Sequence, residues 1–280
     1  SAATVQIESR GDTKPSVAGV GEVWVDTQFE MTSGKTKPGT ATKVRASDWT
    51  VERKVALPGI DMNNPHNMWA DRDEKRIYQT EWFSHRLTVF DRATGALVGT
   101  SDVGPDPSHV MTRPRTDELM IAQNGGNSVV ELAPGGLAPA GRFASQLPGE
   151  KPAHPHAHWM SANGTTMITP NPNLNNATVY DMVGRTIRHV PTGKLPIASS
   201  ITPDGATAYV ANFLDHTVSC ISLTSTPTCN NGGTDVATST IDLWEGYDPV
   251  SGSTPKPIGG LPIQIPTSPD GRAVLVADTL

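Results

Sequence analysis

The segment Ile201-Thr-Pro-Asp-Gly-Ala-Thr-Ala-Tyr-Val-Ala-Asn-Phe213 has the pattern of a strand, a tight Asp-Gly turn and a second strand. Four other parts of the 280-residue chain can be laid over it, namely 69–82, 111–124, 159–171 and 267–278. A third strand follows in four of the five repeats, and most of those continue into a fourth. Four strands in about 40–45 residues are typical of one blade of a β-propeller.

Composition agrees with one large all-β domain. The chain has 26 glycines and 24 prolines, which lie between short apolar runs, as expected for many short strands joined by tight turns. It contains no apolar run of about 18 residues that could span a membrane. The net charge of -6 and the absence of a basic stripe argue against a nucleic-acid partner.

Residues 200–213 resemble the YVTN-type propeller repeat, and this resemblance covers about residues 20–280. The motifs Asn64-Pro-His-Asn-Met-Trp69 and His154-Pro-His-Ala-His-Trp159 are similar to those of the copper-binding propellers of nitrous oxide reductase and thiocyanate dehydrogenase. The resemblance implies an all-β fold, a β-propeller of four-stranded blades, with copper in its channel.

The strand count bears on how the ring closes. Three strands precede the first complete repeat, four complete blades follow, and two strands end the chain; about 21 strands do not close a ring of four-stranded blades. We expect a propeller that is seven-bladed when complete, occupying residues 16–280, with residues 1–15 as a polar arm. An open ring exposes strand edges, so we expect a segment beyond Leu280 or a second chain to supply the last strands.

The stretch His154-Pro-His-Ala-His158 places three imidazoles at every second residue. Alternate side chains of an extended strand share a face, so His154, His156 and His158 are expected to face the propeller channel together. His66 precedes His156 by two repeats and His109 precedes it by one, each within one residue of the same blade position. Three neighbouring blades should therefore direct one imidazole each at a common axis.

Such a cluster predicts a metal site. Imidazole is a ligand for copper, zinc, iron and nickel, and the lack of a nearby carboxylate or thiolate favours copper over calcium or magnesium. We expect the site to hold two or three copper ions, bound by His66, His109, His154, His156 and His158. The alternative for each histidine is that it caps a turn or bonds to a backbone group.

Two loops carry candidate catalytic groups. Lys35 and Lys37 lie in the loop of the N-terminal partial blade, and a lysine beside a metal cation would have a lowered amine pKa and could act as an acid, a base or an anion ligand. The copper enzymes that the chain resembles place a lysine near their copper. Glu245 or Asp248, in the loop 243–250, could bind metal or relay protons. A solvated surface loop is the alternative in both cases.

The remaining histidines, the tryptophans and the cysteines have simpler expected roles. His85 and His216 precede third strands and are either outer supports of the site or surface residues, whereas His189 is expected to face solvent. Packing between blades is the role expected for the tryptophans Trp69 and Trp159. Cys220 and Cys229 flank a hairpin loop and are expected to form a disulfide in an exported protein, with two free thiols as the alternative.

Together these features predict a periplasmic or extracellular copper oxidoreductase that acts on a small inorganic sulfur or nitrogen compound and passes electrons to an acceptor such as a cytochrome. The chain lacks the cysteine and histidine motif of an electron-transfer cupredoxin domain, which favours a thiocyanate-dehydrogenase-like enzyme over one like nitrous oxide reductase. A non-catalytic copper-binding or scaffold propeller is the alternative, because propellers host many functions.

Overall fold

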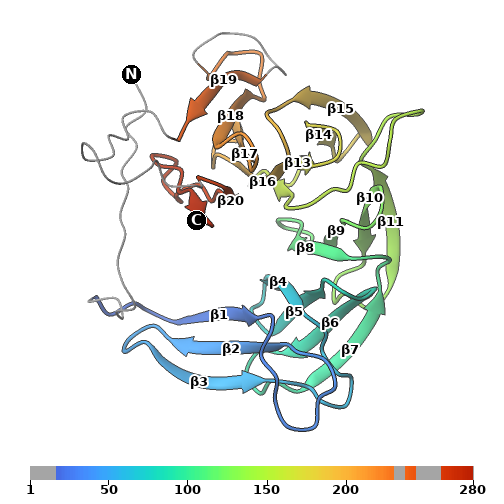
Figure 1. The fold of residues 1–280 in the computed structure, drawn as a ribbon, viewed down its shortest axis with the longest axis vertical. Coiled ribbons are helices and arrows are strands. Elements are labelled where there is room, and N and C mark those ends of the chain that lie inside the picture. Colours follow the sequence, from blue (N-terminus) through green and yellow to red (C-terminus); the bar gives the residue numbers. More distant parts are fainter. Residues whose placement is uncertain (1–16, 230–236, 244–259, 280) are drawn as a thin grey trace, which may run out of the picture.

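The computed structural model describes residues 17–229, 237–243 and 260–279, and these form a β-propeller. Figure 1 shows six antiparallel sheets arranged around a common centre. This confirms the predicted fold class. No helix in the described ranges is long and apolar enough to cross a membrane.

The sheets follow one another along the chain. Blade 1 has three strands and blades 2 to 5 have four each, followed by the pair β20 and β21. The strands are β1 (Glu22–Thr27), β2 (Thr40–Arg45), β3 (Thr50–Val55), β4 (Pro65–Ala70), β5 (Arg76–Glu81), β6 (Arg86–Asp91), β7 (Leu97–Asp102), β8 (Pro107–Thr112), β9 (Leu119–Gln123), β10 (Ser128–Leu132), β11 (Pro139–Ala144), β12 (Trp159–Met160), β13 (Thr166–Asn171), β14 (Asn176–Asp181), β15 (Thr186–Pro191), β16 (Pro196–Ile201), β17 (Thr207–Asn212), β18 (Thr217–Ser222), β19 (Ala237–Asp242), β20 (Pro262–Gln264) and β21 (Ala277–Asp278).

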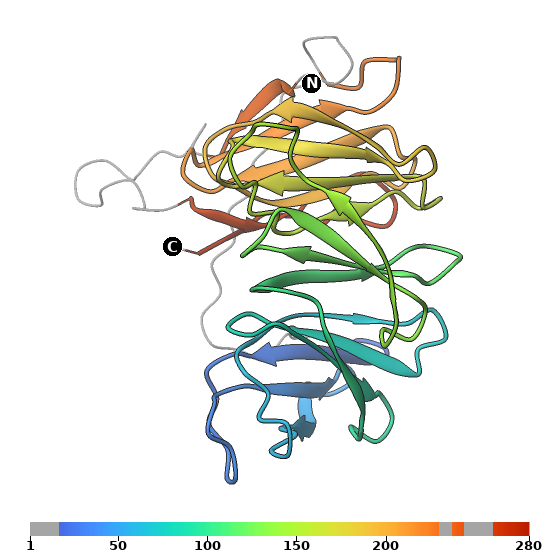
Figure 2. The ribbon, with the colours of Figure 1, turned by 90° about the vertical axis from the view of Figure 1, so that its right-hand side faces the viewer.

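Each complete blade starts at the centre of the ring and ends at its rim. The first strands β4, β8 and β16 face the centre in Figure 1, and the blades stack side by side in Figure 2. A proline opens the inner strand of four sheets, and Pro155 stands shortly before β12. The first residue of a strand is one of the few places where a sheet accepts proline, because its missing N–H costs no ladder bond there.

A buried polar residue ends the second strand of each complete blade. These strand-end polar residues, all at most 2 % exposed, are Glu81, Gln123, Asn171 and Asn212. Asn171, for example, donates to the hydroxyl of Thr178 at 2.7 Å, and Asn212 to that of Ser219 at 2.9 Å. Each bond crosses from the second to the third strand, and because a buried polar group must find a partner, it holds the hairpin in register.

Apolar side chains from facing sheets form the core between blades. Trp69 and Trp159 meet edge to face with ring centroids 5.8 Å apart, and both pack on the cluster that contains Met111 and Met160. The prediction that these two tryptophans pack between blades is confirmed.

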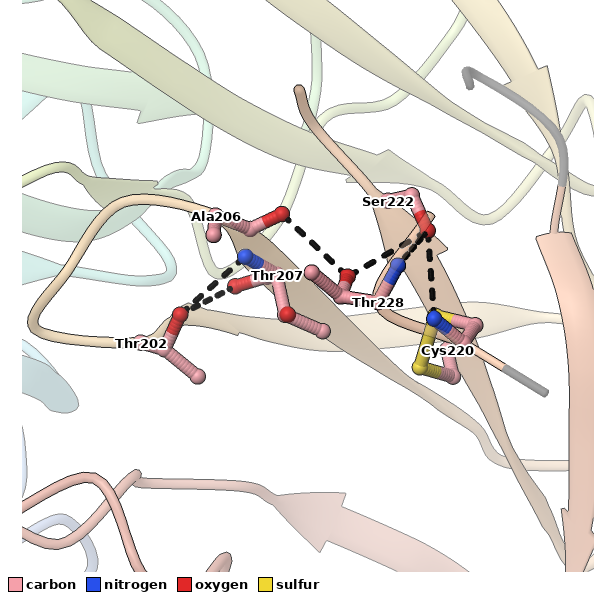
Figure 3. The surroundings of a disulfide bond; sticks show 7 residues. Thr202, Ala206, Thr207, Cys220, Ser222 and Thr228 are labelled. Atoms are coloured by element: carbon pink, nitrogen blue, oxygen red, sulfur yellow. Dashed lines mark hydrogen bonds between the residues drawn. A yellow bond between two sulfur atoms is a disulfide. The ribbon is translucent and has the colours of Figure 1, made fainter. Parts of the chain in front are cut away.

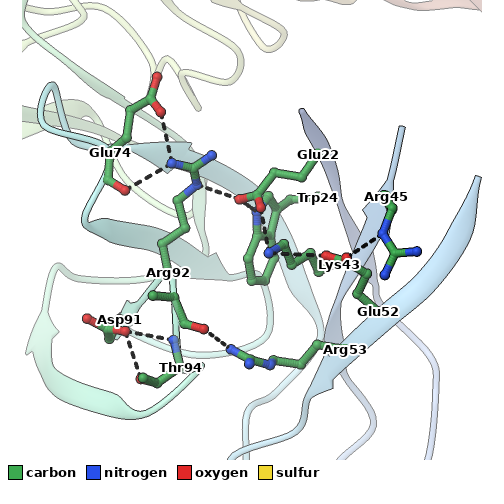
Figure 4. Close-up of polar contacts among 11 residues, drawn as sticks. Glu22, Trp24, Lys43, Arg45, Glu52, Arg53, Glu74, Asp91, Arg92 and Thr94 are labelled. Atoms are coloured by element: carbon green, nitrogen blue, oxygen red, sulfur yellow. Dashed lines mark hydrogen bonds and ion pairs between the residues drawn. The ribbon is translucent and has the colours of Figure 1, made fainter. Parts of the chain in front are cut away.

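Charged groups add to the junction between blades 1 and 2 (Figure 4). Glu22 on β1 pairs with Lys43 at 2.6 Å and with Arg92, which follows β6. Beneath this network the ring of Trp24 packs on Phe90 with centroids 5.6 Å apart. Apolar contact supplies most of the stabilisation here, since partly exposed ion pairs contribute at most about 1 kcal/mol each.

The disulfide predicted from the sequence is present. Cys220 on β18 bonds to Cys229, and the hydroxyl oxygen of Ser222 accepts hydrogen bonds from the backbone N–H groups of Thr228 and Cys229 at 2.9 and 3.2 Å (Figure 3). The loop between the cysteines is thus tied to its strand both covalently and by hydrogen bonds.

Candidate metal centre

Three histidines from three successive blades meet at the centre of the ring. His66 lies on β4, His109 on β8 and His156 just before β12, and one ring nitrogen of each lies within 4.8 Å of the others. Their ring centroids are 5.1 to 5.3 Å apart. The predicted convergence is confirmed, and the three histidines form a group that could hold a metal ion.

Burial keeps these imidazoles neutral. His109 and His156 are each 8 % exposed. Burial lowers the pKa of His66 to about 3, helped by repulsion from His156, and lowers that of His156 to about 4. Burial, together with the neighbouring histidines, also holds the pKa of His109 well below its usual value. Neutral imidazoles offer the lone pairs that a metal requires.

The hydrogen bonds of the rings leave nitrogen lone pairs available. The Nδ1–H of His156 donates to the carbonyl of Ile197 at 2.7 Å, which leaves its Nε2 as an acceptor or ligand. A backbone carbonyl of this kind fixes the tautomer and orientation of metal-binding histidines. The Nε2 of His66 is buried without a partner, although buried polar atoms normally have one. The donor set and this unsatisfied nitrogen fit a bound metal ion.

An indole ring covers part of the cluster. Trp82 lies with its ring centroid 4.1 Å from that of His66 and 5.3 Å from that of His156. It follows the strand-end polar residue of blade 2 directly, and its backbone N–H donates to the carbonyl of Asn64 at 3.0 Å. Sequence reasoning missed this residue, although its place at the end of a second strand, next to the strand that carries His66, could have indicated it.

His154 and His158 do not lie on a continuous strand with His156, so that prediction was wrong. Strand β12 begins only at Trp159, and His154 has a φ of 54°, a left-handed conformation. This segment connects the rim of blade 3 to the centre of blade 4, and Pro155 interrupts any regular ladder.

The rings of these two histidines consequently have different surroundings. The Nδ1–H of His154 donates to the carbonyl of Asn124 at 2.5 Å. His158 is 3 % exposed, its ring nitrogens make no hydrogen bond of normal geometry, and burial lowers its pKa to about 4. Their predicted role as metal ligands stays a prediction.

Lys35 and Lys37 make their hydrogen bonds to Ala56, Met62 and Asp61 and not to the histidine trio. The buried ammonium of Lys35 donates to the carbonyls of Ala56 and Met62 at 3.0 and 2.8 Å, and burial lowers its pKa against the opposing attraction of Asp61. Lys37 is exposed, with its backbone N–H bonded to Asp61 at 2.9 Å. The catalytic roles of both lysines stay predictions.

Of the other candidates, Glu245 and Asp248 lie outside the described residues. His85 is exposed and His216 is partly buried. His189 does not face solvent as expected, because its side chain is only 12 % exposed. It lies near the Glu150 carboxylate, with 3.1 Å between Nδ1 and Oε1, and Glu150 belongs to a loop that the local sequence around His189 could not reveal.

The chain was compared with known proteins. No protein family and no curated protein matches the sequence. Solved structures do match: a Desulfotomaculum acetoxidans protein of unknown function has a TM-score of 0.64 and 13% identity, and the alignment covers 85% of this chain and 69% of that one.

Two enzyme-related structures match similarly. A Bacteroides uniformis protein proposed as a 6-phosphogluconolactonase gives a TM-score of 0.61 at 20% identity, over 92% of this chain and 75% of its own. A catalytically inactive virginiamycin B lyase from Staphylococcus aureus, crystallised with quinupristin, gives 0.60 at 12% identity, over 89% and 72%. Such identities establish the propeller fold and nothing about activity.

Proposed function

We propose that this chain is the metal-binding propeller of an exported copper oxidoreductase, similar to thiocyanate dehydrogenase, that acts on a small inorganic sulfur or nitrogen compound. One observation carries the proposal: three neutral imidazoles from three blades, two of them buried and that of His66 partly exposed, direct nitrogens to within 4.8 Å of one another. A histidine needed only for packing would satisfy its ring nitrogens within the protein, whereas the Nε2 of His66 has no partner.

The donor set favours copper among the metals. The trio supplies nitrogen alone, which suits copper, zinc, iron or nickel and is unsuited to calcium or magnesium. Among divalent ions of the first row, affinity for such a site peaks at copper. Three protein ligands leave a coordination position for substrate, as in catalytic metal sites. His154 and His158 would be ligands for a second or third ion.

The protein residues have distinct tasks in this proposal. The carbonyl of Ile197 holds a proton on Nδ1 of His156 and so keeps the opposite nitrogen free. Trp82 packs on two of the three ligand rings and keeps water from that side. Blade 5 and the β20–β21 pair carry Ile197 and Ile263 where blades 2, 3 and 4 carry histidine, so the pocket would have an aliphatic side. When bound, copper would supply the change of oxidation state.

Localisation and partners follow from the same proposal. The Cys220–Cys229 disulfide supports export to the periplasm or the cell exterior, because such bonds persist in oxidising compartments. An oxidation catalysed there needs an electron acceptor, and a cytochrome is the partner that we propose.

Metal analysis of the purified protein tests the proposal. We expect copper to co-purify or to bind stoichiometrically after reconstitution, with an electron paramagnetic resonance signal showing nitrogen hyperfine structure. The variant His109→Leu should lose most of the metal, whereas the matched control His85→Leu, at an exposed histidine, should keep it.

Three results would count against the proposal, in whole or in part. Failure to bind copper would remove it entirely. Copper bound by His109→Leu as tightly as by the parent would move the metal away from the trio. Copper binding without turnover of thiocyanate, nitrous oxide or related substrates would instead indicate a copper-binding propeller without catalysis.

A further inference from the structure

A groove of about 630 Å³ opens between blades 3 and 4, away from the trio His66, His109 and His156. It is lined by β10, β11, the following loop and Ile187 of β15. Strand β11 is the outermost of blade 3, whereas His109 lies on the innermost, β8. Three strand spacings of about 4.8 Å each therefore separate the groove from the metal centre by about 14 Å.

One cation and several apolar groups line this groove. Arg142 is the only charged residue among the described residues that form its wall, and the apolar contribution comes from Ala144, Leu147, Pro148 and Ile187. No carboxylate in the described ranges pairs with Arg142. Glu150, the nearest acidic residue along the chain, is already engaged by the N–H of Leu147 at 2.7 Å.

The guanidinium of Arg142 is held in place from one side. Its Nη1 donates to Oε1 of Gln123 and to the hydroxyl of Ser128, both at 2.9 Å, and both partners are buried. Gln123 Oε1 and Ser128 Oγ are in contact with each other, so both bonds lie on the same side of Nη1. The Nε and Nη2 hydrogens, which form the flat edge that binds a carboxylate with two parallel bonds, have no partner among the described residues.

Blade 3 departs from the repeat at this place. In the other complete blades, the third strand supplies a hydroxyl to the strand-end polar residue, from Thr88, Thr178 or Ser219. Blade 3 has Val130 there, with Arg142 opposite it on β11, and its strand-end residue is the longer Gln123. Gln123 thus anchors an arginine where the other blades bury a hydroxyl.

We propose that this groove binds a small organic monocarboxylate with an aliphatic or aromatic tail. The free edge of one guanidinium matches one carboxylate, and the lining offers no second cation for a dianion such as phosphate. The apolar side chains would cover the tail, and the volume lies within the range of ordinary small-ligand sites. The site is independent of the metal centre.

Backbone amide NMR with hexanoate as the probe tests this proposal. We expect saturable shifts of the amide signals of Ser128, Ala144 and Ile187 at hexanoate concentrations in the millimolar range or below, because a ligand with so few atoms binds with modest affinity. Acetate, which lacks the tail, and hexanol, which lacks the charge, should each bind at least tenfold more weakly. Leu147→Ser should weaken hexanoate binding severalfold; Leu147 is 37 % exposed, so the fold should tolerate this change.

Arg142→Met should abolish hexanoate binding, and Arg142→Lys should weaken it at least tenfold, because an ammonium lacks the two-pronged edge. Metal content and the thermal midpoint report whether these variants remain folded. Three results would overturn the proposal: no shifts with hexanoate, equal affinity in Arg142→Met, or acetate binding as well as hexanoate, which would mean an adventitious anion only. Any of these would leave Arg142 as a structural partner of Gln123 and would not affect the copper proposal.

Discussion

The buried histidines make the stability of the metal-free protein sensitive to mild acid. Their pKa values are lowered in the folded state, to about 3 for His66 and about 4 for His156 and His158, with His109 well below its ordinary value. Below pH 6.5 the unfolded chain takes up protons that the folded chain does not, so stability present above that pH is lost as the pH falls.

The size of the effect follows from these values. Between pH 7 and pH 5.5 each such histidine destabilises the folded state by about 1.2 kcal/mol, or about 5 kcal/mol for the four. Asp26 opposes this, because burial raises its pKa to about 7 and the folded side chain gains a proton in the same range. Its contribution of about 1.7 kcal/mol leaves a net loss of about 3.3 kcal/mol.

Urea denaturation of chelator-treated protein, followed by tryptophan fluorescence, measures this loss. In the variant His158→Leu, the part of the acid-induced loss of unfolding free energy that comes from the histidines should be smaller by about a quarter. In His85→Leu this loss should equal that of the parent protein. Saturating copper should raise the unfolding free energy at both pH values but leave the loss between them nearly unchanged, because the imidazoles of the folded chain carry no proton in this range with or without the metal. Equal unfolding free energies at pH 7 and pH 5.5 in the metal-free protein would refute this reasoning.

Three further predictions concern individual contacts. Asn212→Leu should lower the unfolding free energy by about 1–3 kcal/mol, because it removes the bond to Ser219 and leaves that buried hydroxyl without its partner; urea titration measures this, and an unchanged midpoint would contradict it. Reduction of the Cys220–Cys229 disulfide, whose cysteines are 9 residues apart, should lower the unfolding free energy by about 2–3 kcal/mol; a Cys220→Ser/Cys229→Ser double variant with the parent's thermal midpoint would show that the bond does not stabilise the fold. Trp82→Leu should weaken copper binding severalfold, because the imidazole of His66 loses the indole ring that packs on it. The control Trp49→Leu, at a tryptophan whose indole N–H bonds to the carbonyl of Val17, should not change copper binding. Competitive titration with a chromophoric chelator compares the two variants, and equal affinities would exclude a role for the Trp82 indole.

Much of the fold could be predicted because the sequence repeat determines where equivalent residues of successive blades lie. Once the strand–turn–strand unit recurs, equivalent positions such as those of His66 and His109 must point to a common centre, and they do. Their convergence needed no knowledge of side-chain contacts, only of register and blade order.

What could not be predicted depends on segments that do not repeat. The placement of His154 and His158 is set by the connection between blades 3 and 4, where local pattern gives no guide to the path of the chain. The contact of Trp82 with the histidine rings and the pairing of His189 with Glu150 depend on side-chain packing that the repeat alone does not specify. Alternation in sequence predicts a shared face only where the backbone stays extended.

The strand-end polar residues have a consequence for how such a ring could arise and change. Because Asn171 and Asn212 find their partners within their own sheets, the bond that holds each of these two hairpins in register is made without the sheet beside it. Gene duplication could therefore add or remove whole sheets without disturbing this bond. Polar contacts between sheets, such as those of Glu22 with Arg92 and of Thr178 with Ser145, would have to form anew at each junction, whereas the central positions stay open to acquire new chemistry one sheet at a time.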